Sequence, residues 1–505
     1  MVKNKKLILK SFDSQNSTIV NLSRLLIATP IYYLYLCNRL IFTMQLNQLF
    51  IDEINGILPS DEAKAMLDAI ASSSPTTAVR FNEAKGFKAL TAMQSVPWCQ
   101  SGIYLPERPP FTFDPMFHAG CYYVQDPSSM FIAHIIKSLI NRPVKYLDLC
   151  AAPGGKTTAA LQALPKGSIM ISNEIMPQRA QILRENVIKW GADNCMVTCD
   201  NPKSIGTLVH EFDVIAADVP CSGEGMFRKD DEAIAQWSPA LVEQCAARQR
   251  TVLQDIWPAL KPGGLLIYST CTYNTHENEE IVDFIINNLK APPISLSISD
   301  SWNIHPAISR NYPCYRFLPH LTKGEGLFMC VLQKDTDNTT DICADKPQKT
   351  KKANTSIPNE MLNWIEGDYS LDANNEVINA VPNYIKAAVK DKYNKLHIIK
   401  HFGVELGTIK GKKAIPSHQL AMSPNINPTS FPIVDVDYKT AINYLRGQAI
   451  IINAPRGYVL LNYNGSTLGF VNNLGNRANN LYPKPWRIIS SHTPDVAPQV
   501  VKHYK

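Results

Sequence analysis

The stretch VKYLDLCAAPGGKT, residues 144–157, decides the fold class of this chain. It begins with a short apolar run, residues 144–149, that is typical of a buried strand. A loop of small residues follows, and a helix is expected to open near Thr157. Glycines in such a loop permit close approach to the backbone, and the helix N-terminus supplies free N–H groups. The stretch therefore predicts a strand, a ligand-binding loop and a helix.

Strands and helices alternate downstream of this stretch. We expect strands over residues 169–172, 196–198, 212–217, 265–269 and 327–332, helices over 177–190, 239–260 and 276–289, and a turn at 261–264. This alternation specifies a parallel, doubly wound sheet covered by helices on both faces. Ligands of such sheets bind beyond the carboxyl ends of the strands.

Length, charge and cysteine content limit the class of protein. With 505 residues the chain exceeds a single core of about 250 to 300 residues, so two or three domains are expected. The net charge of +6 only slightly favours anionic partners such as nucleic acid. A solvated surface without any binding role would explain the same charge. The 12 cysteines include no C-x-x-C pair, which argues against a zinc site or a disulfide framework, so we expect no metal.

The N-terminus superficially resembles a signal sequence. However, its apolar run, residues 25–37, has only 13 residues and no small-residue cleavage site follows it. Met44 opens an amphipathic helix pattern, so we interpret residues 1–43 as a dispensable extension or a start-site misassignment. We therefore expect no membrane segment and a cytoplasmic protein.

Composition divides the remainder into regions. Residues 44–140 are expected to form an RNA-binding region that is mostly helical with loops, and residues 141–334 form the α/β domain. A polar linker, residues 335–356, separates this domain from a C-terminal region, residues 357–505.

The loop and a later acid together indicate a nucleoside site. Glu174 lies 20 residues past Gly154, at the end of the second strand, where a carboxylate can accept hydrogen bonds from ribose hydroxyls. The alternative is a plain strand-to-helix turn. The loop lacks both G-x-G-x-x-G and the Walker pattern, so S-adenosylmethionine fits better than a dinucleotide or a nucleoside triphosphate. Asp200, after the third strand, is a candidate for the adenine amino group.

Two cysteines follow the fourth and fifth strands, in DVPCSG (218–223) and STCT (269–272). Neighbouring strand ends would direct both thiols into the cofactor crevice. A thiolate that adds to carbon 6 of a pyrimidine makes carbon 5 nucleophilic. Asp218 could stabilise the charge that develops on the base, with help from Lys156. A second thiol could assist release of the product. The target base must be unpaired or flipped out. Each cysteine could instead be a buried structural residue, and spacing does not decide which one attacks.

Three motifs occur in the order DLCAAPGGKT (148–157), DVPCSGEGMFRK (218–229) and STCTYNTHENE (269–279), and together they resemble the signature of the Nop/Sun family of RNA cytosine-5 methyltransferases. The resemblance implies that Cys271 is the nucleophile and that Cys221 helps product release, whereas DNA cytosine-5 methyltransferases attack with the cysteine of the PC motif. The cofactor contacts that it implies are Cys150, Ala151, Ala152, Pro153, Gly154, Gly155, Lys156, Glu174, Asp200 and Asp218.

Within that family, the chain resembles the bacterial RsmF-type ribosomal RNA methyltransferases over segments 96–105, 122–130, 320–334, 399–423 and 445–488. The resemblance implies an α/β, Rossmann-like methyltransferase domain with a late antiparallel strand, a helical N-terminal region and an α+β C-terminal region. The latter ends in a PUA-like β-barrel, at about residues 440–505. Candidate RNA contacts there are Arg477, Asn480, Tyr482, Lys484 and Arg487, although the barrel could merely pack on the rest of the chain.

The resulting hypothesis is a monomeric enzyme that uses S-adenosylmethionine to methylate carbon 5 of a cytidine in small-subunit ribosomal RNA. The alternatives are a methyltransferase acting on transfer RNA or DNA, and a non-catalytic RNA-binding assembly factor. Intact Asp218, Cys221 and Cys271 weigh against the last alternative, because a pure binding module needs none of them.

Overall fold

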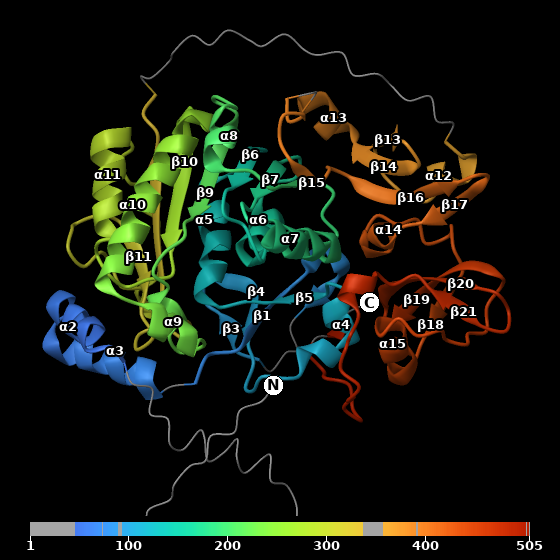
Figure 1. Cartoon of the computed structure of the whole chain (residues 1–505), viewed down its shortest axis with the longest axis horizontal. Helices are drawn as coiled ribbons and strands as arrows, with labels where there is room; N and C mark the ends of the chain where they lie inside the picture. Colours follow the sequence, from blue (N-terminus) through green and yellow to red (C-terminus); the bar gives the residue numbers. More distant parts are fainter. Residues whose placement is uncertain are drawn as a thin grey trace, which may run out of the picture. The chain divides into compact units, whose positions relative to one another are not determined.

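The structure is a computed structural model that describes residues 46–72, 74–88, 93–336, 357–389, 392–500 and 502–503 (Figure 1). The predicted extension, residues 1–43, and nearly all of the predicted linker lie outside these residues. Within the described part, no helix is long and apolar enough to cross a membrane.

An eight-stranded sheet with the order β11-β12-β10-β9-β6-β7-β8-β15 forms the central domain. Its strands are β6 (Lys145–Asp148), β7 (Ile169–Asn173), β8 (Cys195–Thr198), β9 (Phe212–Asp218), β10 (Leu260–Thr270), β11 (Cys314–Phe317), β12 (Leu327–Gln333) and β15 (Ile398–Lys400). The five strands from β8 to β10 are parallel, so their carboxyl ends meet at one edge. β12 runs antiparallel to β10, which confirms the late antiparallel strand.

Helices cover both faces of this sheet, as the alternation predicts (Figure 1). One face packs against α5 (Phe131–Leu139), α6 (Gly155–Ala163) and α7 (Pro177–Trp190), and the other against α8 (Pro202–Gly206), α10 (Pro239–Ile256) and α11 (Glu279–Leu289). Successive residues Val214 and Ile215 of β9 belong to the two opposite cores. Because both faces are buried, the strands are continuous apolar runs without polar alternation.

Several boundaries differ from those expected. The predicted turn at 261–264 is part of β10, which begins at Leu260 and has a register irregularity before Leu265. Gly263 lies in the left-handed region, and its N–H donates to the Lys334 carbonyl at 2.9 Å, which keeps the irregular segment attached to the sheet. Neither β11 nor the three-residue strand β15 was predicted. β15 belongs to the C-terminal region and pairs with β8.

The N-terminal region begins with α2 (Gln48–Ile57) and α3 (Ser60–Ser72), in agreement with the helical prediction. It also contains a four-stranded sheet that was not predicted, with the order β3-β4-β1-β5. These strands are β1 (Ala78–Phe81), β3 (Ser95–Val96), β4 (Cys99–Tyr104) and β5 (Tyr122–Val124). Every residue of β1 is buried. Its sequence therefore lacks the alternation of apolar and polar residues by which a half-buried strand is recognised.

The C-terminal region contains two further sheets. β13 (Tyr369–Asn374), β14 (Val377–Pro382), β16 (Val404–Lys410) and β17 (Lys413–Pro416) form the first, flanked by α13 (Asn383–Val389) and α14 (His418–Met422). β18 (Ile433–Asp435), β19 (Gly457–Tyr463), β20 (Ser466–Asn473) and β21 (Ala478–Asn480) form the second, beside α15 (Tyr438–Leu445). The second sheet shares a core with the N-terminal sheet, in which Val79 and Ile103 cluster with Val459 and Leu461.

Candidate active site

The two predicted cysteines meet at the carboxyl edge of the central sheet. β9 and β10 are adjacent parallel strands in which Asp218 pairs with Ser269, so the loops that follow them lie side by side. The Sγ atoms of Cys221 and Cys271 are 3.1 Å apart, and the Cys271 backbone N–H donates to the Cys221 Sγ at 3.3 Å. The structure thus joins two thiols that are 50 residues apart in the chain.

The two thiols are not equivalent. The pKa of Cys221 lies well above its ordinary value because its thiol hydrogen bonds to Cys271, because it is buried, and because the negative charges of Cys271 and Glu277 oppose its ionisation. Cys221 is therefore held as a thiol.

Lys156 and Asp218 form an ion pair that joins the cofactor loop to the end of β9. Lys156 Nζ lies 2.8 Å from Asp218 Oδ2, and the Ser269 hydroxyl donates to Asp218 Oδ1 at 2.7 Å. Burial lowers the pKa of Lys156, but the charge and hydrogen bond of Asp218 outweigh burial and raise that pKa overall. The pair therefore presents a fixed ammonium and a fixed carboxylate beside the two thiols.

Two buried glutamates, which the sequence analysis did not single out, hold the cysteine loops together. Glu277 Oε2 accepts hydrogen bonds from the backbone N–H of Ser222 at 3.0 Å and from Gln249 Nε2 at 2.8 Å. Glu224 Oε2 accepts from the backbone N–H groups of Tyr273 at 2.6 Å and Asn274 at 3.0 Å. Each carboxylate thus reaches from one cysteine loop to the other. Both lie within the quoted motifs, but no sequence pattern shows that they are buried.

Gly225 permits the close approach of these two loops. Its N–H donates to the Cys271 carbonyl at 2.8 Å. A Cβ at this position would lie 3.0 Å from that oxygen and 2.6 Å from the carbonyl oxygen of Gly326. Any larger side chain would therefore displace the backbone of Cys271.

The predicted cofactor loop connects β6 to α6. Gly154 has φ 111° in the left-handed region and precedes the first turn of α6, whose N-terminal N–H groups face the carboxyl edge of the sheet. Asn186 donates to the Pro153 carbonyl at 2.7 Å and Arg179 to the Ala152 carbonyl at 2.9 Å, both from α7. The loop is thus held from behind by side chains that the sequence analysis did not identify.

Glu174 and Asp200 lie at the ends of β7 and β8, as predicted, but their hydrogen bonding differs. Glu174 is 2% exposed. Its Oε1 accepts from the Met176 N–H at 3.0 Å, while Oε2 accepts no hydrogen bond from any described residue and has only Arg179 at 3.3 Å. Asp200 Oδ2 accepts from the backbone N–H of His397 at 2.9 Å, which ties it to the C-terminal region.

The candidate RNA contacts in the last sheet divide into two groups. Arg477 and Lys484 are exposed. Tyr482 is buried and its hydroxyl lies 3.1 Å from His118 Nδ1 of the N-terminal region, while Asn480 donates to two backbone carbonyls. Tyr482 is therefore buried away from solvent, which corrects its expected contact with RNA, whereas the Asn480 amide supports the packing of this sheet from a half-buried position. Arg487 is half-buried and packs close to Gly447.

Among the described residues, no group of three or more His, Cys, Asp or Glu side chains could hold a metal ion.

Three family models match the chain in order. The N-terminal domain of 16S rRNA methyltransferase RsmF matches residues 46–127, 16S rRNA methyltransferase RsmB/F matches residues 140–333, and the methyltransferase RsmF PUA domain matches residues 431–488. The matched segments correspond to the N-terminal sheet and its helices, the central domain and the last sheet.

The sequences of similar proteins align with most of this chain. Ribosomal RNA small subunit methyltransferase F of Shewanella sediminis is 27% identical over 474 residues, which cover 87% of this chain and 96% of the relative. Its counterpart in Shewanella oneidensis is 25% identical over 462 residues. The crystal structure of PH0851 has a TM-score of 0.52 at 20% identity, over 59% of this chain and 68% of that one, and shows a shared fold. The chain therefore belongs to the RsmB/F family of 16S rRNA methyltransferases and carries the N-terminal and PUA domains of its RsmF members.

Proposed function

We propose that the protein transfers a methyl group from S-adenosylmethionine to carbon 5 of a cytidine in small-subunit ribosomal RNA, with Cys271 as covalent nucleophile. One observation carries this proposal: two thiols 3.1 Å apart lie beside the Lys156–Asp218 ion pair at the cofactor edge of the sheet. Methyl transfer to an oxygen or an amine needs no thiol nucleophile, whereas carbon 5 of a pyrimidine does.

The relatives support ribosomal RNA as the substrate. They are named as methyltransferases of the small ribosomal subunit RNA, and the alignment with them covers 87% of this chain. Exposed Arg477 and Lys484 on the last sheet are available for phosphate contacts.

The residues around the loop suit S-adenosylmethionine, the cofactor of this family. The unsatisfied Oε2 of Glu174 can accept hydrogen bonds from ribose hydroxyls, and Gly154 with the start of α6 admits a polar group to the backbone. Residues 150–156, Glu174, Asp200 and Asp218 would hold the cofactor. When bound, S-adenosylmethionine supplies a methyl group activated by its positively charged sulfonium.

The thiolate of Cys271 forms a bond to carbon 6 of the flipped-out cytosine, which makes carbon 5 nucleophilic. Asp218 and Lys156, whose carboxylate and ammonium are held 2.8 Å apart, would stabilise charge at the Watson–Crick edge of the base. The Sγ atoms of Cys221 and Cys271 are in hydrogen-bond contact, and the raised pKa of Cys221 favours its thiol form, so we assign the attack to Cys271.

Release reverses the covalent bond. Once carbon 5 has gained the methyl group, a water molecule acting as base takes its proton, the C5–H electron pair forms the C5=C6 double bond, and the bond between carbon 6 and Cys271 Sγ breaks with its electron pair returning to sulfur. The Cys221 S–H, 3.1 Å from that sulfur, can hydrogen bond to the departing thiolate and stabilise its negative charge.

Substitution of each cysteine tests this division of roles. Cys271→Ala should abolish methyl transfer to ribosomal RNA and leave S-adenosylmethionine binding nearly unchanged. Cys221→Ala should accumulate a protein–RNA adduct that survives denaturing electrophoresis, because addition continues while release is impaired. Tritium transfer from labelled S-adenosylmethionine and the gel shift measure the two effects.

Full activity of Cys271→Ala would show that Cys271 is not the nucleophile. An adduct formed by Cys271→Ala but not by Cys221→Ala would show that Cys221 is the nucleophile and Cys271 assists release. Mapping of 5-methylcytosine across all RNAs in cells with and without the gene tests the substrate. A lost mark in transfer RNA, with ribosomal RNA unaffected, would contradict the substrate class.

A further inference from the structure

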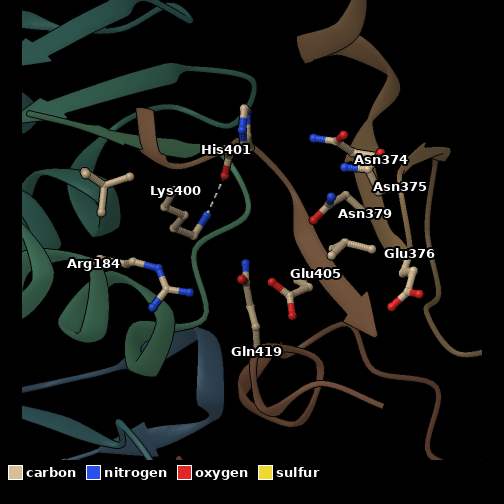
Figure 2. Close-up of a pocket in the computed structure, with 11 residues that line it drawn as sticks. Arg184, Asn374, Asn375, Glu376, Asn379, Lys400, His401, Glu405 and Gln419 are labelled. Atoms are coloured by element: carbon tan, nitrogen blue, oxygen red, sulfur yellow. Dashed lines mark hydrogen bonds between the residues drawn. The ribbon is translucent and has the colours of Figure 1, made fainter. Parts of the chain in front are cut away.

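A cavity of about 590 Å³ lies between α7 of the central domain and the β13-β14-β16-β17 sheet (Figure 2). Its half-buried polar lining comes from four separate elements, namely Arg184 on α7, Asn379 on β14, Glu405 on β16 and Gln419 on α14. None of the proposed catalytic or cofactor residues lines it. The volume is within the range of small-molecule and cofactor sites.

Two opposite charges, those of Arg184 and Glu405, face this cavity without a direct hydrogen bond or ion pair between them, although the positive charges of Arg184 and Lys400 act on the Glu405 carboxylate. Arg184 makes no hydrogen bond or ion pair with any described residue, and the carboxylate of Glu405 also has no such partner in the described part of the chain. Figure 2 shows both side chains directed into the same space. Lys400 differs, because its buried ammonium donates to the carbonyls of Cys195 at 3.0 Å, His401 at 3.1 Å and Gly403 at 3.2 Å. Its donors are therefore all used.

The remaining groups add neutral donors and acceptors. Asn379 is the cross-strand partner of Glu405 in the β14–β16 pair, so their side chains lie on the same face. Gln419 Nε2 donates to the Gly403 carbonyl at 3.0 Å, which leaves the amide oxygen of Gln419 for the cavity. The guanidinium donors of Arg184 thus lie on the α7 side, and the Glu405 carboxylate lies on the sheet side beside the Asn379 amide, which offers both a donor and an acceptor.

This arrangement excludes several ligand classes. A phosphate would face the carboxylate of Glu405 and that of Glu376, which also lines the cavity. A metal ion would lack ligands, because no cluster of three or more His, Cys, Asp or Glu exists among the described residues. A lipid would find a polar lining. A neutral, planar ligand with donors on one edge and acceptors on another remains, and nucleobases have this character.

We propose that this cavity binds one unstacked guanine of the RNA substrate, an inference that rests on the proposed function. The ring N–H and adjacent amine of guanine match the carboxylate of Glu405, and its O6 and N7 match the guanidinium of Arg184. Adenine and cytosine present an acceptor beside their amine, and uracil has no amine. Lys400 of β15 lines the cavity, and Cys221 follows β9. Four strand spacings, on the order of 20 Å, separate β15 from β9, so this guanine lies outside the catalytic crevice.

Binding of fluorescein-labelled pentanucleotides to the full chain tests the proposal by anisotropy, without any methyl transfer. Four probes are compared, UUGUU, UUAUU, UUCUU and the inosine version of the first, which lacks only the guanine amine. The wild type should bind UUGUU at least about tenfold more tightly than the inosine probe, the loss expected for one hydrogen bond to a charged group. Glu405→Gln should erase that difference, and Arg184→Ala should weaken the guanine and inosine probes equally.

Lys412→Ala, an exposed lysine on the β16–β17 turn, is the matched control and should change none of these values. Equal affinity for the four probes, or a guanine preference that survives both Arg184→Ala and Glu405→Gln, would overturn the proposal. S-adenosylmethionine binding and methyl transfer at saturating RNA are measured on the same variants and should match the wild type. A wild type without any transferase activity would instead refute the proposed function, and the binding result would stand separately.

Discussion

Glu174 has a buried carboxylate oxygen that no described donor satisfies by a hydrogen bond. Burial of such an acceptor costs about 1 to 3 kcal/mol unless a ligand supplies the missing bond. We therefore expect Glu174→Gln to raise the Kd for S-adenosylmethionine about tenfold or more, as measured by calorimetry. Exposed Glu107→Gln is the control. An unchanged Kd would mean that the ribose hydroxyls bind elsewhere.

Single residues also show which parts of the site could be predicted. Asp218, Cys221 and Cys271 were predictable because strand ends are recognisable from apolar runs, and adjacent parallel strands end at the same edge. Glu224 and Glu277 were not, because a glutamate in a polar motif is usually exposed. Only the packed structure shows that Glu277 is 0% exposed and surrounded by donors.

The loops after β9 and β10 act as one unit because buried carboxylates connect them. Glu277→Gln keeps the shape of the side chain but replaces one acceptor oxygen by a donor, which faces the Ser222 N–H or Gln249 Nε2 unfavourably. We expect kcat to fall by up to about 100-fold, with KM and cofactor binding nearly unchanged, because the cysteines shift relative to the base. Rapid-quench kinetics would show slower adduct formation.

Glu243→Gln on the exposed face of α10 is the control for this prediction, because its side chain is 69% exposed. If Glu277→Gln lowers the melting temperature but leaves kcat and adduct formation at wild-type levels, the glutamate stabilises the domain and does not position the cysteines.

The first and last regions of the described chain meet in a core that includes His118. In the neutral ring, Nε2–H donates to the Thr112 carbonyl at 2.8 Å and Nδ1 accepts from the Tyr482 hydroxyl at 3.1 Å. Burial, with a smaller contribution from the Lys189 charge, lowers the pKa of His118 to about 3. An unfolded histidine titrates near 6.5, so the unfolded state binds this proton first as the pH falls.

Stability from this group is therefore fully present above about pH 6.5 and is lost progressively toward pH 3. Up to about 2 kcal/mol should be lost between pH 6.5 and 5. Urea unfolding at several pH values measures this slope, and His118→Gln should flatten it. His276→Gln, at an exposed position, should not. The same slope in His118→Gln as in the wild type would assign the acid sensitivity to other groups.

At the scale of the whole molecule, the sequence by itself determined the α/β order of the central domain, the cofactor loop at residues 150–156 and the presence of two cysteines at strand ends. These features are local, since strand, loop and helix patterns depend on neighbouring residues. Only the tertiary structure decided the 3.1 Å contact of the thiols, the addition of β15 to the central sheet and the burial of Tyr482 against the N-terminal region. Each of these features depends on residues at least 50 positions apart in the chain. Packing sets side-chain burial and strand register between such distant residues, and no local sequence pattern encodes it.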